Sequence, residues 1–291
     1  MPSIAFFASL SGRSANDNRT RLPHAFAVAG WETVCIEHES LALGGRQLSG
    51  MSSDGTRVVL QGQSRYFILG FGNAATYLDR MQMLGALPEG RFVNIPAALT
   101  RQHGKVSLYL DHPDIPQPES HVSNDPSTLA ALVHSGGEWI GKPPAGSFGR
   151  DVFLLCAGDA NLGTILSHLT RDGRYALLQR RIPMERGERR VLLAGGKVIG
   201  AYGKTPSDHR GNLHAGATPM PATLEPDELA LAQKLAGRLL HQGVGFAAID
   251  MAWPYVLEVN LANPGWLETY ERLTGEDLSH AVVDALAEID C

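Results

Sequence analysis

The stretch of sequence that decides the fold is AIDMAWPYVLEVN, which runs from Ala248 to Asn260. Apolar residues on both sides of its WPY segment predict two buried strands joined by a turn. A turn about Pro254 places Asp250 opposite Glu258, and side chains directly opposite each other on paired strands point to one face. Asn260 lies two residues beyond Glu258 and therefore shares that face. The oxygen atoms of all three side chains are therefore expected to lie close together on one face of the hairpin.

These three donors admit two interpretations. Two neighbouring carboxylates repel each other unless a cation lies between them, and Mg²⁺ prefers one or two carboxylates together with substrate phosphates. Asp250, Glu258 and Asn260 are therefore candidate magnesium ligands. The alternative is a hairpin with one solvated face, where the same side chains meet water. From these residues alone the two interpretations carry equal weight.

The composition narrows the class of protein. The chain has 291 residues, 44% of them hydrophobic and 19% charged, as expected of a folded soluble protein of two or three small domains. A net charge of −5 argues against a nucleic-acid partner held by a broad basic surface. Cys35, Cys156 and Cys291 are too scattered for a disulfide framework or zinc site, so we expect free thiols and a cytoplasmic protein. The apolar run Ile4–Leu10 is too short to span a bilayer, and we expect no membrane partner.

Strands and helices alternate in roughly the first 113 residues, which predicts a parallel sheet with helices on its faces. The expected strands are Ile4–Leu10, Glu32–Glu37, Arg65–Gly70 and Arg91–Asn94, and the expected helices are Arg21–Gly30 and Ala75–Leu84. The proline-rich segment DHPDIPQPES (111–120) then reads as a linker.

Beyond this linker shorter strands and helices follow each other. A helix should begin at Asp125-Pro126, and Gly195-Gly196 should turn a hairpin. The remaining expected elements are strands Trp139–Lys142, Val152–Cys156 and Tyr175–Arg181, and helices Asn161–Thr170, Pro226–Gly243 and one from Ser279. The hairpin Arg189–Tyr202 surrounds the glycine pair.

The spacing from Asp250 to Glu258-Val259-Asn260 resembles the metal-binding end of the ATP-grasp ligases. The order of upstream motifs most resembles bacterial glutathione synthetase and related RimK-type ligases. This likeness runs from about Val93 to the C-terminus. The motifs that carry it are Val93–Leu99 before Lys105, GKPPAGSFG (141–149), Gln179–Pro183, Gly187–Val191, and HRGNL (209–213) with Ala215-Gly216.

The resemblance implies an ATP site. Lys105 and Lys142 would contact the phosphates, and the loop Gly146, Ser147, Phe148, Gly149 would cover them. The backbone of Gln179, Arg180 and Ile182 would receive the adenine, Leu257 would pack near it, and Glu188 would accept the ribose hydroxyls. The alternatives are solvated lysines, an ordinary turn, a plain strand end, core packing of Leu257 and a solvated salt-bridge cluster around Glu188.

The resemblance also implies a two-step reaction: phosphoryl transfer from ATP to a carboxylate, then attack of an amine on the acylphosphate. Arg190, Arg210 and Asn212 would stabilise the transferred group. Asn263, Pro264 and Gly265 would grip a substrate carboxylate, although Asn263 has a helix N-cap as its alternative. No nucleophilic side chain is required.

The fold class implied is α/β, with the α+β ATP-grasp arrangement. Its expected parts are an N-terminal parallel-sheet domain (1–113), a small central lid (114–182) and a C-terminal antiparallel-sheet catalytic domain (183–291). The implied cofactors are ATP and two Mg²⁺ ions, with Mn²⁺ as a substitute. The implied partners are small amino-acid or peptide substrates and further copies of the chain, in a dimer or tetramer.

The first ~90 residues depart from the pattern. Glutathione synthetases carry an Arg-Lys-Asp-Pro-Pro-like run after the strand near Leu69, whereas this chain has the uncharged Gly70–Ala75. The run after Asn260 also reads LANPGW, closer to other peptide-forming ATP-grasp ligases. We therefore expect an amide ligase for an amino acid or small peptide. The alternatives are glutathione synthetase itself, which joins γ-glutamylcysteine to glycine, and a nucleotide-binding protein of this fold without turnover.

Overall fold

The computed structural model describes residues 1–10, 16–102, 104–145, 150–205, 217–264 and 267–289. Several of the predicted site residues lie outside these ranges: Gly146, Ser147, Phe148, Gly149, Arg210, Asn212 and Gly265. Within the described ranges, none of the helices has the length and apolar character needed to cross a membrane.

The N-terminal part is built on a parallel sheet of strand order β2-β1-β6, as the alternating pattern predicts. The bounds are β1 Ser3–Ala8, β2 Glu32–Glu37 and β6 Arg65–Ile68, with helices α1 Asn18–Val28, α2 Tyr77–Leu84, α3 Pro96–Gln102 and α4 Val106–Asp111. Strand β1 is central and buried on both faces. Ala5 and Phe7 contribute to one hydrophobic core, and Ile4, Phe6 and Ala8 to another, because successive side chains alternate between faces.

Two features of this part differ from the sequence prediction. A small antiparallel sheet intervenes between β2 and β6, formed by β3 Ala42–Gly44, β4 Gln47–Met51 and β5 Arg57–Val59. The predicted strand Arg91–Asn94 is wrong, since only isolated bridges link Phe92 to Tyr66 and Asn94 to Val244. The side chain of Asn94 instead bonds both the amide and the carbonyl of Phe246, at 2.9 and 2.8 Å. These side-chain bonds replace the ladder that a strand would form.

The central part is a separate small lobe, which we call the lid (residues 120–180). Its antiparallel sheet has the order β7-β10-β8-β9, and two helices pack on it. The bounds are β7 Ser120–Ser123, α5 Pro126–His134, β8 Trp139–Lys142, β9 Phe153–Leu155, α6 Leu162–Thr170 and β10 Ala176–Arg180. As predicted, α5 begins after Asp125, whose carboxylate accepts from the amides of Ser127 and Thr128.

The C-terminal part is a five-stranded antiparallel sheet of order β13-β12-β11-β14-β15. The bounds are β11 Glu188–Ala194, β12 Lys197–Thr205, β13 Thr218–Pro221, α7 Pro226–His241, β14 Phe246–Ala252, β15 Tyr255–Asn260, α8 Leu267–Thr274 and α9 Ser279–Ala287. Gly195 and Gly196 turn the first hairpin with φ of 56° and 72°, as predicted. Helix α7 packs on one face, and α8 and α9 pack on part of the other.

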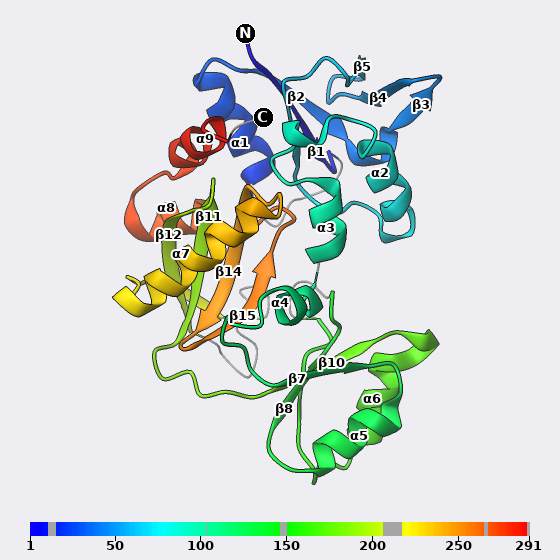
Figure 1. Ribbon diagram of the computed structural model, residues 1–291, viewed down its shortest axis with the longest axis vertical. Coiled ribbons are helices and arrows are strands. Elements are labelled where there is room, and N and C mark those ends of the chain that lie inside the picture. The colour runs from blue at the N-terminus through cyan, green and yellow to red at the C-terminus, as the bar shows by residue number, and fades with distance from the viewer. Residues whose placement is uncertain (11–15, 103, 146–149, 206–216, 265–266, 290–291) are drawn as a thin grey trace.

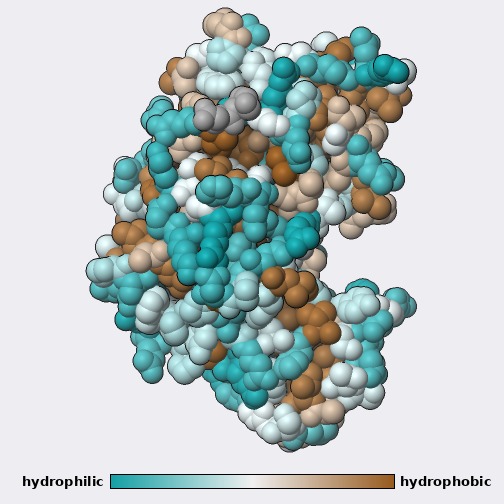
Figure 2. Space-filling model, in the orientation of Figure 1, coloured by the Kyte–Doolittle hydropathy of each residue, from teal (hydrophilic) through white to brown (hydrophobic). Residues whose placement is uncertain are grey.

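The N-terminal and C-terminal parts share two hydrophobic cores, whereas the lid has a separate core. One core combines Phe7 of β1 with Ile249 of β14, and another stacks Phe67 edge-on against Phe246 at 5.6 Å between ring centroids. The lid has a core of its own around Trp139 and Leu166. In Figure 1 the lid lies below the rest of the molecule, and Figure 2 shows the surface hollowed between them. The predicted boundaries at residues 113 and 182 remain predictions.

Candidate active site

The predicted metal hairpin forms as the sequence indicates. Asp250 of β14 is paired with Glu258 of β15, and Asn260 is paired with Ala248. On its other side Asp250 is paired with Arg190 of β11, which in turn is paired with Tyr202 of β12. A single row of polar side chains therefore crosses four strands.

This row lies at one end of a sheet face whose other end is apolar. Leu192 and Ala248 are the neighbours on the same face of Arg190 and Asp250, and they belong to the core under α8 and α9. The face thus changes from hydrophobic to charged along the strands. A solvated strand face is excluded for Asp250, because only 5% of its surface is exposed.

A β-bulge shapes the hairpin next to Asp250. The register shifts so that Met251 pairs with Val256, which leaves Leu257 as the additional residue. Val256 and Val259 are buried, whereas Leu257 and Glu258 are both partly exposed. The strict alternation assumed from the sequence therefore fails at Leu257. Its contact with adenine stays a prediction.

The carboxylate of Asp250 is held by two cations. Arg190 donates to both of its oxygens, at 2.8 and 2.5 Å, and the Lys204 Nζ lies 3.0 Å away. The Asn260 amide also donates to it at 3.3 Å. Burial opposes ionisation, but Arg190 and Lys204 outweigh it and hold the pKa of Asp250 well below its usual range. Burial likewise opposes the charge of Arg190, yet Asp250 raises the pKa of that guanidinium.

Lys204 is a site residue that the sequence reading missed. It is 3% exposed and forms a very short ion pair with Glu188, its partner across the β11–β12 hairpin. Counting outward from the Gly195-Gly196 turn would place Gly203 opposite Glu188, because a bulge at Leu192/Leu193 shifts the register by one residue. The pair excludes the solvated salt-bridge cluster proposed as an alternative for Glu188. Burial raises the pKa of Glu188, although Lys204 counteracts this.

The two predicted ATP lysines both point into this region. Lys105 is 4% exposed, and its Nζ lies 3.3 Å from Glu258. Its backbone amide donates to the Pro144 carbonyl of the lid, at 3.0 Å. Lys142 ends β8 and donates to Gln179 at 2.8 Å. Burial and the charge of Lys105 lower the pKa of Lys142 to about 8, against the attraction of nearby carboxylates.

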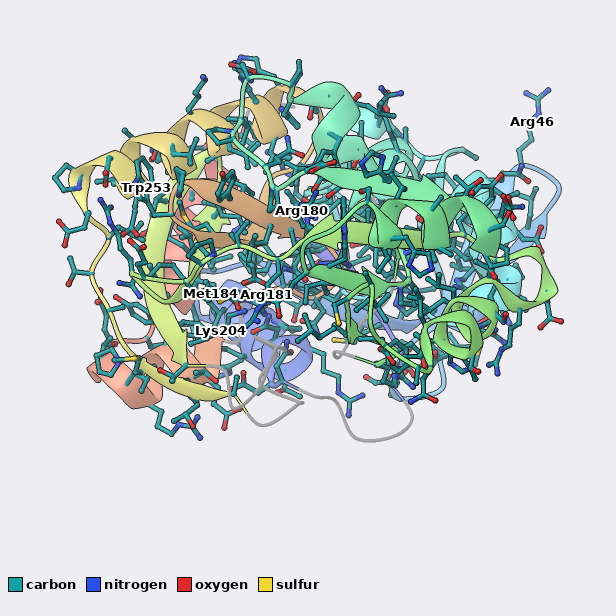
Figure 3. The ribbon with its side chains drawn as sticks, turned by 90° about the horizontal axis from the view of Figure 1, so that it is seen from below. Arg46, Arg180, Arg181, Met184, Lys204 and Trp253 are labelled. Carbon is teal, nitrogen blue, oxygen red and sulfur yellow. The ribbon has the colours of Figure 1, made fainter. Side chains whose placement is uncertain are left out.

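The predicted adenine segment leaves β10 and enters the C-terminal sheet. The amides of Arg180 and Arg181 donate to the carbonyls of Glu119 and Glu138, at 2.8 and 2.9 Å. These bonds engage the amides of Arg180 and Arg181, and the contact of this segment with adenine stays a prediction. The guanidinium of Arg180 lies 3.9 Å from the centre of the Trp139 ring. In Figure 3, which is seen from the lid end, Arg180 and Arg181 are labelled where the chain leaves β10, and Lys204 is labelled on β12.

The predicted substrate loop after β15 is clamped by the N-terminal part of the chain. Asn16 donates to the carbonyl of Asn263 at 3.1 Å, and Asn18 donates to that of Pro264 at 2.7 Å. Among the described residues, the side-chain oxygens of Asn18 and Asn263 are buried without a hydrogen-bond partner. Helix α8 begins at Leu267, so Asn263 is not its N-cap. The sequence reading missed Asn16 and Asn18, which carry no motif.

The charged residues of this region form what we call the charge cluster. Its cations are Lys105, Lys142, Arg190 and Lys204, and its carboxylates are Glu188, Asp250 and Glu258. The cations outnumber the carboxylates, as suits a polyanion such as a triphosphate.

The described residues contain no close group of three His, Cys, Asp or Glu side chains that would hold a metal without other ligands. The cross-strand carboxylates of Asp250 and Glu258, with the Asn260 amide beside them, nevertheless suit Mg²⁺, which takes few protein ligands and completes its shell with phosphates and water. Glu258 and the Asn260 oxygen therefore fit a magnesium ion bound together with a nucleotide, whereas Asp250 would have to exchange one of its bonds to Arg190, Lys204 or Asn260 for the metal.

Comparisons with known proteins bear on the whole arrangement. The family model described as the prokaryotic glutathione synthetase ATP-grasp domain matches residues 107–275. A glutathione synthetase of Gloeobacter violaceus is 31% identical over 226 residues, which cover 74% of this chain and 69% of that protein. One of Nostoc sp. is 31% identical over 170 residues, or 57% of this chain. The chain spans about half of that relative, 52% of its length.

Solved structures agree in fold. An ATP-grasp protein with a RimK domain from Sphaerobacter thermophilus superposes with a TM-score of 0.66 at 21% identity, covering 98% of this chain and 99% of its own. The D-cycloserine synthetase DcsG gives a TM-score of 0.73 at 16% identity, with the same coverage of 98% and 99%. The expected ATP-grasp fold is confirmed. The chain belongs to the family of the prokaryotic glutathione synthetase ATP-grasp domain.

Proposed function

We propose that the protein is an ATP-dependent, Mg²⁺-requiring ligase that joins the carboxylate of an amino acid or small peptide to an amine. The observation that carries this proposal is the charge cluster, in which four described cations, two of them buried, face three carboxylates at the junction of lid and sheet. An excess of buried positive charge is costly unless an anionic ligand compensates it. The triphosphate of ATP supplies that compensation.

In this proposal the phosphates, the metal ion and the adenine are each bound by a different group of residues. Lys105 and Lys142 hold the phosphates from two sides, one beside Glu258 and the other on the lid. Asp250, Glu258 and Asn260 hold Mg²⁺, which when bound neutralises phosphate charge, with a second Mg²⁺ and replacement by Mn²⁺ included in the proposal. The backbone from Gln179 to Ile182, with Leu257, receives the adenine.

Phosphoryl transfer to the carboxylate then requires positioning and charge stabilisation more than a nucleophile. Arg190 is held in a fixed orientation by its two bonds to Asp250 and lies opposite Tyr202, so its guanidinium is preorganised for a developing negative charge. Arg210 and Asn212, which lie outside the described residues, complete this role in the proposal.

The amine has a candidate position at the clamped loop. The unpaired oxygens of Asn18 and Asn263 are acceptors, so they call for N–H donors. An attacking amine supplies such donors. We therefore assign the amine-bearing substrate to this loop, whereas the sequence prediction placed a substrate carboxylate on Asn263, Pro264 and Gly265.

A substrate screen tests the proposal. The protein is incubated with ATP, Mg²⁺ and pools of carboxylates and amines, and ADP release is measured together with the mass of a dehydrated conjugate. A conjugate of γ-glutamylcysteine and glycine would identify the alternative, glutathione synthetase proper. Measurable ATP binding without ADP release in any pool would instead favour the nucleotide-binding protein without turnover.

A further inference from the structure

A chain of hydrogen bonds runs from the lid lysine into the linker. Lys142 donates to the Oε1 of Gln179 at 2.8 Å, and the Nε2 of Gln179 donates to the Tyr109 hydroxyl at 2.7 Å. That hydroxyl contacts Ser120 Oγ at very short range and the Pro118 carbonyl at 3.1 Å. Ser120 also donates to Pro118, at 3.0 Å.

The donors and acceptors fix the direction of this chain. A lysine ammonium can only donate, so the amide oxygen of Gln179 must face Lys142. The NH₂ group must then face Tyr109, whose oxygen accepts. The single hydrogen of the Tyr109 hydroxyl is left for Ser120 or Pro118. Every polar atom of the Gln179 side chain is therefore engaged in one orientation only.

The chain bridges parts of the molecule that are far apart in sequence. Tyr109 belongs to α4, Ser120 begins β7, and Gln179 and Lys142 lie on the lid strands β10 and β8. Gln179 is 5% exposed, so water cannot readily replace a lost partner. Burial raises the pKa of Tyr109, which keeps its hydroxyl neutral and hydrogen-bonding at neutral pH.

We propose that Tyr109 is a positioning residue for the ATP phosphates, because it orients the Gln179 amide and thereby holds Lys142 toward the nucleotide. This inference rests on the ATP site of the proposed function and is independent of which acid and amine are joined. Tyr109 itself need not touch ATP. Its effect should appear only with ligands that carry phosphates.

The test compares ATP with adenosine. Tyr109→Phe removes only the hydroxyl oxygen, and we expect the Kd for ATP to rise about fivefold, since one buried amide loses its partner. The Kd for adenosine, which has no phosphates, should stay within about twofold by the same reasoning. Both constants are measured by isothermal titration calorimetry, with circular dichroism to verify folding.

Two further variants make the result decisive. Tyr175→Phe removes the same oxygen from a tyrosine that is 58% exposed next to β10, and it should change neither constant. Gln179→Met keeps the side-chain volume but breaks the chain at its middle, so it should reproduce the loss for ATP. The double variant Tyr109→Phe, Gln179→Met should be no weaker than Gln179→Met alone, because coupled residues are not additive.

Three outcomes would overturn the inference: unchanged ATP affinity in Tyr109→Phe, an equal loss for adenosine and ATP, or additive losses in the double variant. An equal loss would mean that Tyr109 merely supports the fold. A wild-type protein that binds adenosine but not ATP would refute the proposed phosphate site as well. Normal ATP binding without ligase turnover would refute the proposed function alone.

Discussion

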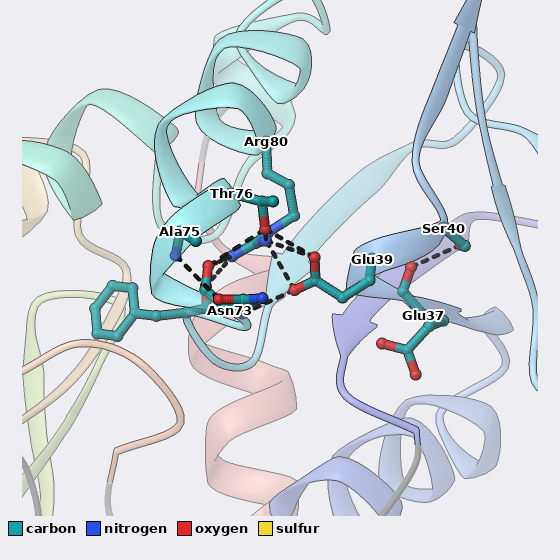
Figure 4. Close-up of polar contacts among 8 residues, drawn as sticks. Glu37, Glu39, Ser40, Asn73, Ala75, Thr76 and Arg80 are labelled. Atoms are coloured by element: carbon teal, nitrogen blue, oxygen red, sulfur yellow. Dashed lines mark hydrogen bonds and ion pairs between the residues drawn. The ribbon is translucent and has the colours of Figure 1, made fainter.

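Arg80, which is buried, and Arg190, whose side chain is 11% exposed, both pair with carboxylates but differ in what surrounds them. Arg80 of α2 is 2% exposed and donates to both oxygens of Glu39, at 2.7 and 2.8 Å. It also donates to the carbonyls of Phe71 and Asn73, so protein acceptors surround both terminal nitrogens of the guanidinium, whereas its Nε has no partner among the described residues (Figure 4). This network fastens the loop after β6 to the segment after β2.

Arg190 has the same type of partner but belongs to the charge cluster. Its carboxylate, Asp250, is shared with Lys204, and the neighbouring lysines leave the cluster with an excess of positive charge. The comparison indicates that a pair surrounded by its own acceptors stabilises the fold. A pair within a surplus of cations is arranged for an anion from outside.

The largest expected effect comes from breaking the ligand set at its more exposed carboxylate. Glu258→Gln keeps the shape, removes one charge, and should lower ADP release at least about a thousandfold, as expected when a metal ligand is lost. The side chain of Glu258 is 28% exposed, so the thermal midpoint should change little. Retained activity with normal Mg²⁺ dependence would show that Glu258 is not a ligand. Asp250 is a poorer choice, because its loss would leave Arg190 and Lys204 buried without their partner.

The next effect should fall on stability alone. Arg80→Met leaves Glu39 without its cation and removes several bonds to the loop, so we expect the free energy of unfolding to drop by about 3 kcal/mol. Urea denaturation measures this change, and the Kd for ATP should stay unaltered. A loss of ATP affinity with unchanged stability would reverse the distinction drawn between the two arginines.

A smaller effect concerns pH. With a pKa of about 8, Lys142 loses its proton in the free protein as the pH rises, and ATP binding must then restore it. The Kd for ATP should increase by up to about tenfold per pH unit above this pKa and should level off at lower pH. The Lys142→Arg variant stays charged, so its Kd for ATP should not rise with pH in this way. Calorimetry from about pH 6.5 to pH 9 compares the two proteins. An identical pH profile would exclude Lys142 as the titrating group.

The smallest effect is expected from a pair at the surface. Arg101 bonds Asp111 in a bidentate manner, like Arg190, but 69% of its side chain is exposed. Arg101→Met should therefore change the free energy of unfolding by less than about 1 kcal/mol. Equal losses for Arg80 and Arg101 would mean that burial does not decide the contribution.

Local sequence patterns predicted much of this arrangement. The register of Asp250 against Glu258 follows from a turn and a period of two residues, and the Gly195-Gly196 hairpin follows from its glycines. Features set by distant segments were not predictable in this way. Asn94 bonds Phe246 from 152 residues away instead of joining a strand. Asn18 reaches the loop at Pro264 from 246 residues away. The bulge at Leu257 has no signal in composition or period.

The division of the hydrophobic cores has a consequence for how the chain is made. Strands β1 and β6 leave the ribosome early, yet the aromatic residues that complete their packing, such as Phe246, lie near the end of the chain. The lid is translated after β6 and before Phe246, and the residues of its core all lie within the lid. We therefore expect the lid to reach its native packing first during synthesis. The N-terminal sheet, which is made before β14, stays partly uncovered until the segment around Phe246 has been translated.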